Sequence, residues 1–422
     1  MWNKPWSMKE GFAIGIGLMV TGLMLQFSMK AVEWSLLAWP VNIIVLAFFI
    51  VAALMMFAMR SHVYALRFLI TYQCAVPALI LVSAMTIVMG LTRQVADGQP
   101  PADMLGITRM LSFWPFVLLY VYVAVILSQV TLMQLMYFQW RRLPSLISHV
   151  GLLITLLTAT LGSADMQRLR MMVNKETPEW RVIDPATNKM KELNIAILLK
   201  EFTIDEYPPK LMFYDEVQGA LLPEGNPATL LIDDDFQGGE LQGWQIEVDE
   251  VLDEAQPVTN ADSTSYVEWH QSGAVTALHV KATLPDGSRS ASGWITTGSY
   301  KFPYQLLPVT QHQSIVMAER EPQRYLSKVE IMTESGKHEE ADILVNQPYS
   351  IGGWKIYQLN YDTSRGKWSE ISVLELVRDP WLPSVYIGIY LMIAGAVLLL
   401  FTAKKGFGSS DNNGQSSIVN SQ

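Results

Sequence analysis

One histidine stands in an apolar stretch that is long enough to cross a membrane. His149 lies in SLISHVGLLITLLTATLG, seven residues after Arg142, and Pro144 suits the start of a helix there. At about 1.5 Å of rise per residue, the imidazole would lie roughly 10 Å beyond the arginine, inside the hydrocarbon. An ionisable side chain is costly at that depth, so the position predicts a ligand or a proton relay. A hydrogen bond to a neighbouring helix is the alternative.

The same helix carries small residues on another face. A second helix can approach closely along small residues spaced by four, here Gly151, Thr155, Ala159 and Ser163. Gly151 points about 160° away from His149, because successive residues turn by about 100°. One face can therefore pack on the chain's own helices while His149 faces a partner or a cofactor. Internal packing on both faces is the other possibility.

The remaining polar residues show no pattern of a metal or catalytic centre. His62 falls in a short loop, and four further histidines have no HxH or HxxxH spacing: His270, His279, His312 and His338. The acidic run at 233–235 is typical of a solvated turn. There is no GxSxG, no Walker loop and no GxGxxG between a strand and a helix. The sequence therefore offers little for an enzyme with its own active site.

Six apolar stretches must position these residues. They lie near 11–29, 41–59, 69–91, 110–138, 146–163 and 384–403, and each reaches the roughly 17–25 residues that a membrane helix needs. The fourth is long enough to tilt or to extend past the bilayer. The first has too long an apolar core for a signal peptide, so we interpret it as an anchor. We expect a five-helix region at 1–163, a large domain at 164–381, a final helix at 382–405 and a disordered tail at 406–422.

Charge separates the large domain from the rest of the chain. Residues 164–381 hold 34 of the 39 acidic and 19 of the 30 basic residues, a net charge of −15. Such an acidic domain argues against nucleic acid as a partner. Eight basic residues in the short loops and termini fall on one side of the predicted helices and three on the other, which favours the first side as cytoplasmic. Both termini are then cytoplasmic and the large domain is extracytoplasmic, in a bacterial inner membrane.

The large domain has the pattern of a mainly β fold. Strand-like segments lie at 193–207, 229–233, 243–251, 266–270, 274–284 and 314–321, separated by Gly, Pro, Asp and Asn. This spacing predicts a sandwich or an open barrel. Residues 164–175 are expected to form a short helical exit from the fifth span. The single cysteine, Cys74, lies in the third span, so the domain must be stabilised by its own core.

The last eighty residues resemble the C-terminal signature of the ResB (CcsB) family of cytochrome c biogenesis proteins. The matching pieces are VNQPYSIGGWKIYQLNYD at 345–362, then LVRDPWLPSVYIG at 376–388, then a final apolar helix. The stretch 148–173 is similar to the family's last helix before its large domain, and 201–217 resembles an early strand pair more loosely. Five spans, rather than the simplest family layout of three, precede the large domain.

The resemblance implies one half of a two-protein machine that handles haem. A ResC (CcsA) type partner would carry the tryptophan-rich WWD loop that binds haem. Together they would move haem b across the membrane and join it to the CxxCH cysteines of apocytochrome c. In fused relatives, a histidine at the start of the helix before the large domain is an axial haem ligand, and His149 matches that position. The chain would then be a non-catalytic or shared-site subunit of a cytochrome c synthase.

Two other functions stay open from the residues alone. A membrane-anchored binding or scaffold protein without haem would need only its large domain to capture a partner. A subunit of a quinone or transport complex would explain a histidine within the membrane.

Overall fold

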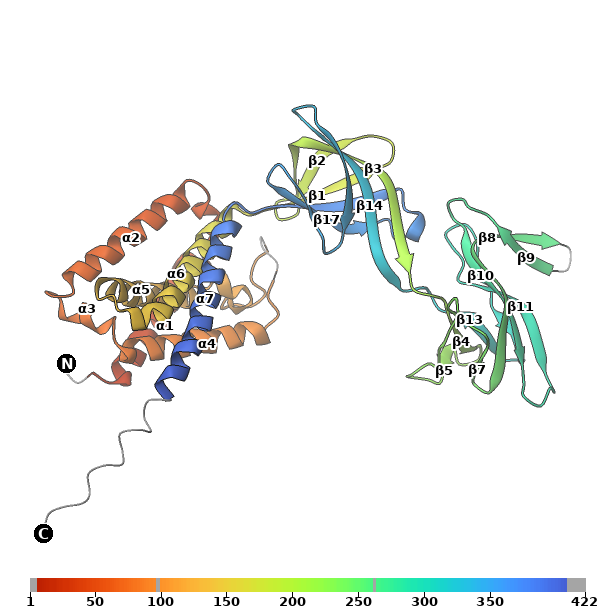
Figure 1. Ribbon diagram of the computed structural model, residues 1–422, viewed down its shortest axis with the longest axis horizontal. Helices are drawn as coiled ribbons and strands as arrows, with labels where there is room; N and C mark the ends of the chain where they lie inside the picture. Colours follow the sequence, from red (N-terminus) through yellow and green to blue (C-terminus); the bar gives the residue numbers. More distant parts are fainter. Residues whose placement is uncertain (1–5, 96–98, 261–262, 408–422) are drawn as a thin grey trace, which may run out of the picture. The chain divides into compact units, whose positions relative to one another are not determined.

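Two compact units make up the chain. The computed structural model describes residues 6–95, 99–260 and 263–407. One unit combines residues 1–167 with 378–422, and the other comprises 168–377. The first is helical and the second is built from antiparallel sheets (Figure 1). The expected tail at 406–422 falls almost entirely outside the described residues.

Six helices of the first unit are long and apolar enough to span a membrane within the described residues. They are α1 Met8–Met29, α2 Val41–Met59, α4 Tyr72–Leu91, α5 Trp114–Met136, α6 Leu143–Gly162 and α7 Leu382–Phe407, with the short α3 Tyr64–Phe68 between α2 and α4. The predicted set of six spans is thus confirmed, and the chain is a membrane protein.

Local chemistry moves several helix ends away from the predicted positions. α1 starts at Met8 rather than 11, because Ser7 and Glu10 form a capping box. The fourth span is shorter than predicted: Ile107–Ser112 is a separate 3₁₀ turn, and Pro115 opens α5. Pro144 lies in the first turn of α6, as expected.

Helices α6 and α7 pack antiparallel through a seam of small residues. A Cβ on Gly388 would lie 2.3 Å from Thr155 Oγ1, and a Cβ on Gly395 would lie 2.2 Å from Ser148 Oγ. Farther along, a Cβ on Gly162 would lie 2.4 Å from the Trp381 side chain. The α6 members are spaced by seven residues and so are the α7 members, which is the repeat of a left-handed helix pair.

The predicted stripe on α6 is therefore only half right. Gly151 and Thr155 do contact α7, but Ala159 and Ser163 are exposed. Positions four apart advance by 400°, so a row at that spacing drifts around the helix by 40° per step. A seven-residue repeat drifts by only about 20° and keeps Gly162 on the seam.

The second unit begins with an eight-stranded sheet in the order β15-β14-β3-β2-β1-β18-β17-β16. These strands are β1 Gln167–Asn174, β2 Glu179–Asp184, β3 Lys189–Glu206, β14 Pro322–Thr333, β15 His338–Leu344, β16 Tyr349–Ile351, β17 Trp354–Tyr361 and β18 Ile371–Arg378. All but β16 supply fully buried side chains to one core, and the two edge strands meet where Tyr349 Oη donates to Glu339 at 2.8 Å. We call this curled sheet the barrel lobe; it has the open-barrel form that the sequence predicts as one of two possibilities.

The segment between β3 and β14 forms two five-stranded sheets that share a core, which is the sandwich form. One sheet has β12 Leu307–Pro308, β13 Gln313–Met317, β4 Lys210–Asp215, β5 Ala220–Leu222 and β6 Leu230–Leu231. The other has β11 Ser290–Thr296, β10 Val275–Thr283, β8 Trp244–Asn260, β7 Gly239–Leu241 and β9 Ser263–Glu268. We call them together the sandwich lobe. The predicted mainly β domain is thus confirmed.

The helical exit expected at 164–175 is wrong. A 3₁₀ turn at Ser163–Asp165 is followed directly by strand β1. Leu169, Met171 and Val173 are completely buried while the residues between them are exposed. That alternation has period two, so this segment can bury its apolar side chains only as a strand.

Candidate functional site

His149 lies on α6, within the span, and is half-buried. Its Nδ1 lies 2.7 Å from the Ser145 carbonyl oxygen, one helical turn earlier, and 3.2 Å from Ser145 Oγ. Because a carbonyl can only accept, Nδ1 carries the proton and donates it. In the neutral ring this leaves Nε2 unprotonated, and no hydrogen bond to Nε2 is found among the described residues. An unprotonated imidazole nitrogen is the form that ligates a metal or accepts a hydrogen bond.

Helix α5 adds a glutamine to this histidine. Gln134 Nε2 donates to Ser145 Oγ at 3.2 Å, which links α5 to the turn that holds His149. The Gln134 Oε1 atom is buried and has no hydrogen-bond partner within the described part of the chain. An unsatisfied buried oxygen costs about 1–3 kcal/mol. Gln134, Ser145 and His149 thus form an intramembrane polar cluster with two acceptors that await a donor or a metal.

The face of α6 that carries His149 is the face toward α5. Ser145, His149, Leu156 and Thr160 follow one row along the helix. Tyr120 Oη of α5 bonds the Leu156 carbonyl at 2.9 Å and Thr160 Oγ1 at 2.7 Å. The Gly151 face packs on α7 instead. Both faces of α6 therefore contact the chain's own helices. Within the described residues, the Nε2 atom of His149 has no hydrogen-bond partner on either face.

An acidic residue that the sequence did not single out ties three helices together. Asp165 accepts hydrogen bonds from the Trp39 backbone N–H at 2.7 Å, Asn42 Nδ2 at 2.6 Å and Trp381 Nε1 at 2.7 Å. Asn42 is completely buried and also donates to the Leu161 carbonyl at 3.2 Å. These bonds join the starts of α2 and α7 to the end of α6. They fix the helix ends from which β1 and β18 continue.

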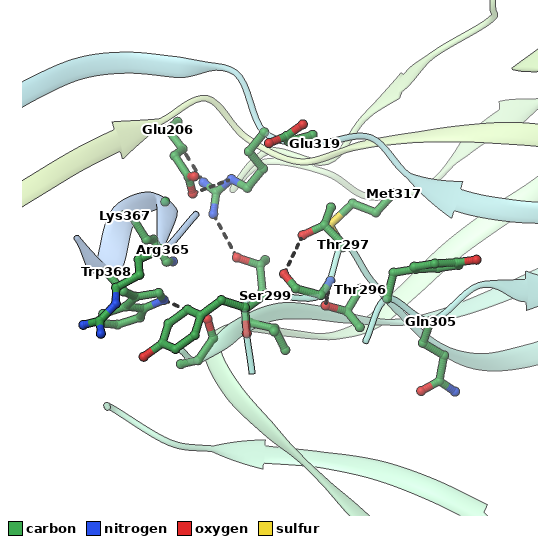
Figure 2. A pocket seen from close by; sticks show the side chains of 18 of the residues that line it. Glu206, Thr296, Thr297, Ser299, Gln305, Met317, Glu319, Arg365, Lys367 and Trp368 are labelled. Atoms are coloured by element: carbon green, nitrogen blue, oxygen red, sulfur yellow. Dashed lines mark hydrogen bonds and ion pairs between the residues drawn. The ribbon is translucent and has the colours of Figure 1, made fainter. Parts of the chain in front are cut away.

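The β unit holds a polar cleft of about 520 Å³. Residues 297–300 and 304–305 of one loop line it, together with Thr276 and the segment 363–368. Figure 2 shows Arg365, Lys367 and Trp368 on one side and Met317 and Gln305 on the other. The volume is in the range of ligand pockets, roughly 300–1,000 Å³.

Arg320 forms one wall of the cleft through hydrogen bonds to both lobes. It donates to the carbonyl of Tyr207 at 2.9 Å and to Thr276 Oγ1 at 3.1 Å, and its Nε lies 3.6 Å from a Glu206 carboxylate oxygen. Trp368 Nε1 donates to the carbonyl of Ala274 at 3.1 Å. The donors of the arginine are largely used, so Arg320 supports the cleft rather than offering a free charge.

The other histidines lie away from these two places. His270, His279 and His338 each lie 3.0–3.1 Å from a carboxylate on the surface of the β unit. No group of three His, Cys, Asp or Glu residues suited to a metal occurs within the described residues. Asp233, Asp234 and Asp235 are exposed, as expected of a solvated turn.

Comparison with known proteins gives one family. A model of the ResB-like family matches residues 302–369. That segment runs from the cleft loop through β13 to β17, and it supplies twelve of the 21 residues that line the cleft. It includes the hairpin on which the resemblance at 345–362 was argued, but not His149. No match to a curated protein was found.

Proposed function

We propose that the chain is the haem-handling subunit of a cytochrome c synthase, a proposal that the match of residues 302–369 to the ResB-like family supports. In this proposal a ResC (CcsA) type membrane protein with a WWD loop is its partner. The complex carries haem b across the inner membrane and delivers it to the CxxCH segment of apocytochrome c. The β unit lies outside the cytoplasm and both termini inside, as the distribution of basic loop residues favours.

The observation that carries the proposal is the state of His149. Its Nδ1–H donates to the Ser145 carbonyl, and in the neutral ring Nε2 then keeps a free lone pair within an apolar span. An axial haem ligand must be a neutral imidazole with that free nitrogen. The hydrogen bond at the opposite nitrogen orients the ring and makes it more basic. The donor set of this chain therefore fits one axial bond, and the second ligand would come from the partner.

The test is His149→Ala in the complex purified with its partner protein. We expect haem content to fall and cytochrome c maturation to fail while the protein still accumulates. Added imidazole should partly restore the haem, because it can occupy the vacated axial site. His62→Ala is the matched control, since His62 is exposed in a loop and, within the described residues, its ring bonds Ser61. Full haem with an unchanged spectrum in His149→Ala would rule out the ligand assignment.

A second candidate function follows from the two acceptors of the polar cluster. His149 Nε2 and Gln134 Oε1 would suit a quinol, whose two hydroxyl groups are donors. The purified complex separates the candidates. A haem spectrum that changes in His149→Ala supports haem, and a bound quinone without haem supports the second candidate.

A further inference from the structure

We propose that segment 135–142, which joins α5 to α6, binds the headgroup of an anionic phospholipid. The inference does not depend on the proposed function, because it rests on this end of the helical unit alone. The segment reads LMYFQWRR, and every one of its residues is exposed. It begins with large apolar and aromatic side chains and ends with two arginines. It therefore offers apolar surface for acyl chains beside cations for a phosphate.

The segment lies at a membrane surface, because it connects the ends of two spans. Helix α5 ends at Met136 and α6 begins at Leu143. Phe138 and Trp140 pack edge to face with their ring centres 5.1 Å apart. Trp140 is nevertheless 79% exposed among the described residues, so in a bilayer its ring meets lipid. An indole suits this depth, because it is apolar over most of its surface and has one polar edge.

The two arginines have hydrogen-bond donors to spare. Neither Arg141 nor Arg142 forms a side-chain hydrogen bond or ion pair within the described residues. The connection from α2 to α4 lies at the same end of the bundle, since successive spans alternate in direction, and its arginines differ. Arg60 donates to the Phe57 carbonyl and Arg67 to the Arg60 carbonyl, each at 2.9 Å. A guanidinium left without such acceptors presents a fork of N–H donors that matches two phosphate oxygens.

Carboxylates that could neutralise these arginines are scarce at this end of the bundle. The sequence has no Asp or Glu from 34 to 96 or from 104 to 164, so both connections at this end lack acidic residues. Within the described residues, Glu10 near the start of α1 is the one carboxylate here, and it accepts from the backbone N–H and the hydroxyl of Ser7. The surplus of positive charge favours an anionic partner.

An arginine without an ion pair would not mark a site by itself. Arg93 and Arg109 also lack one within the described residues, but the connection that holds them contains Asp97 and Asp103. Segment 135–142 differs because adjacent arginines and exposed aromatic rings occur together between two spans, without a carboxylate. An acidic polypeptide would satisfy the arginines but not the apolar side chains, whereas an anionic lipid satisfies both.

The test measures lipid binding to the full chain in detergent by titration and native mass spectrometry. Phosphatidylglycerol and phosphatidylcholine with the same acyl chains differ in the net charge of the headgroup. The variant is Arg141→Gln with Arg142→Gln. The matched control is Arg168→Gln with Arg170→Gln, two exposed arginines just past the other end of α6. Both pairs remove the same charge.

We expect the parent chain to bind phosphatidylglycerol more than tenfold more tightly than phosphatidylcholine, at roughly fivefold per arginine. The variant at 141 and 142 should lose most of this preference, and the control pair should keep it. Arg141→Lys with Arg142→Lys should lose part of it, because lysine keeps the charge without the fork. All these chains should melt at the same temperature in phosphatidylcholine, which separates loss of binding from loss of folding.

Equal binding of the two lipids by the parent chain would overturn the proposal without any variant. An undiminished preference in the glutamine variant, or an equal loss in the control pair, would also overturn it. Displacement of phosphatidylglycerol by an equal concentration of inorganic phosphate would show that the acyl chains contribute nothing, and displacement by a glutamate-rich peptide would assign the segment to a protein partner. Either result contradicts a lipid site. None of these measurements involves haem, so the proposed function is tested separately.

Discussion

Gly151→Ala provides the sharpest test of how α6 is held. A Cβ at this position would lie 2.6 Å from the Gly388 carbonyl oxygen, 2.7 Å from the Met392 nitrogen and 2.9 Å from Leu391 Cβ. Two of these atoms belong to backbone and cannot rotate away. Reaching ordinary contact at 3.4 Å requires α6 and α7 to separate by about 0.8 Å at this point.

Overpacking of this kind typically costs about 1–3 kcal/mol. Alanine also favours a helix over glycine by about 1 kcal/mol, which opposes the loss. Gly17→Ala is the control that removes this second effect, because Gly17 lies in the middle of α1 with no atom within 4 Å of its Cβ position. The difference between the two variants is then the steric cost alone.

The single cysteine is a built-in reporter for the assay. Cys74 is completely buried in α4, so a thiol-reactive dye that becomes fluorescent on coupling should react only as the helices unfold. At about 2–4 °C per kcal/mol for a unit of this size, Gly151→Ala should melt several degrees below Gly17→Ala in detergent. Equal melting temperatures would show that the two helices do not pack through this glycine, and the placement of His149 derived from it would fail.

Two further predictions concern the barrel lobe. Gln358→Leu should destabilise the β unit by about 1–3 kcal/mol in chemical unfolding, because the buried hydroxyls of Ser327 and Ser372 lose the Gln358 Oε1 atom that accepts from both. Adding Ser327→Ala and Ser372→Ala should recover part of this stability, and no recovery would mean that the loss comes from packing alone. The pKa of Glu330 lies below its ordinary 4.5, chiefly through the Lys200 hydrogen bond and then through His338. The ionised carboxylate therefore stabilises the folded β unit above about pH 4.5, and this stabilisation is lost as the pH falls through the lowered pKa. Glu330→Gln should therefore make the free energy of unfolding depend less steeply on pH in the acid range, and an unchanged slope would refute this.

The six spans could be predicted because membrane crossing depends on length and apolar composition, which the sequence states directly. The β class followed from alternation and turn residues for the same reason. The ends of the elements depend on finer chemistry. The capping box of Ser7 and Glu10 and the 3₁₀ turn before α5 each changed a boundary by several residues. Residues 164–175 were predicted to be helical because they directly follow a span. They form a strand because Leu169, Met171 and Val173 alternate with exposed residues, and only a strand buries that pattern on one side.

The contact between α6 and α7 could have been predicted from the sequence by a seven-residue repeat rather than a four-residue one. Gly388 and Gly395 are seven residues apart, as are Ser148 and Thr155. A spacing of four on α6 alone describes one helix in isolation. A pair of helices that supercoil follows sevens on both partners.

The polar partners could not be predicted, because each one joins segments far apart in the sequence. Gln134 looks like a lone amide in an apolar run, and Asp165 looks like the first residue of a polar domain. Only the packing of α5 on α6 places Gln134 against Ser145. The cleft also could not be predicted, because its walls come from β3, β10, β11 and β13 and from three loops, and each segment alone has the composition of ordinary surface.

The depth of His149 was predictable, but the identity of its free nitrogen was not. The bond from Nδ1 goes to the carbonyl four residues earlier on the same helix, so it needs no partner helix and persists wherever α6 is formed. Within the described residues no second histidine lies in a span, so under the proposed function a second histidine ligand would have to come from another chain. A site with two histidine ligands would therefore be complete only when the proposed partner supplies the second one.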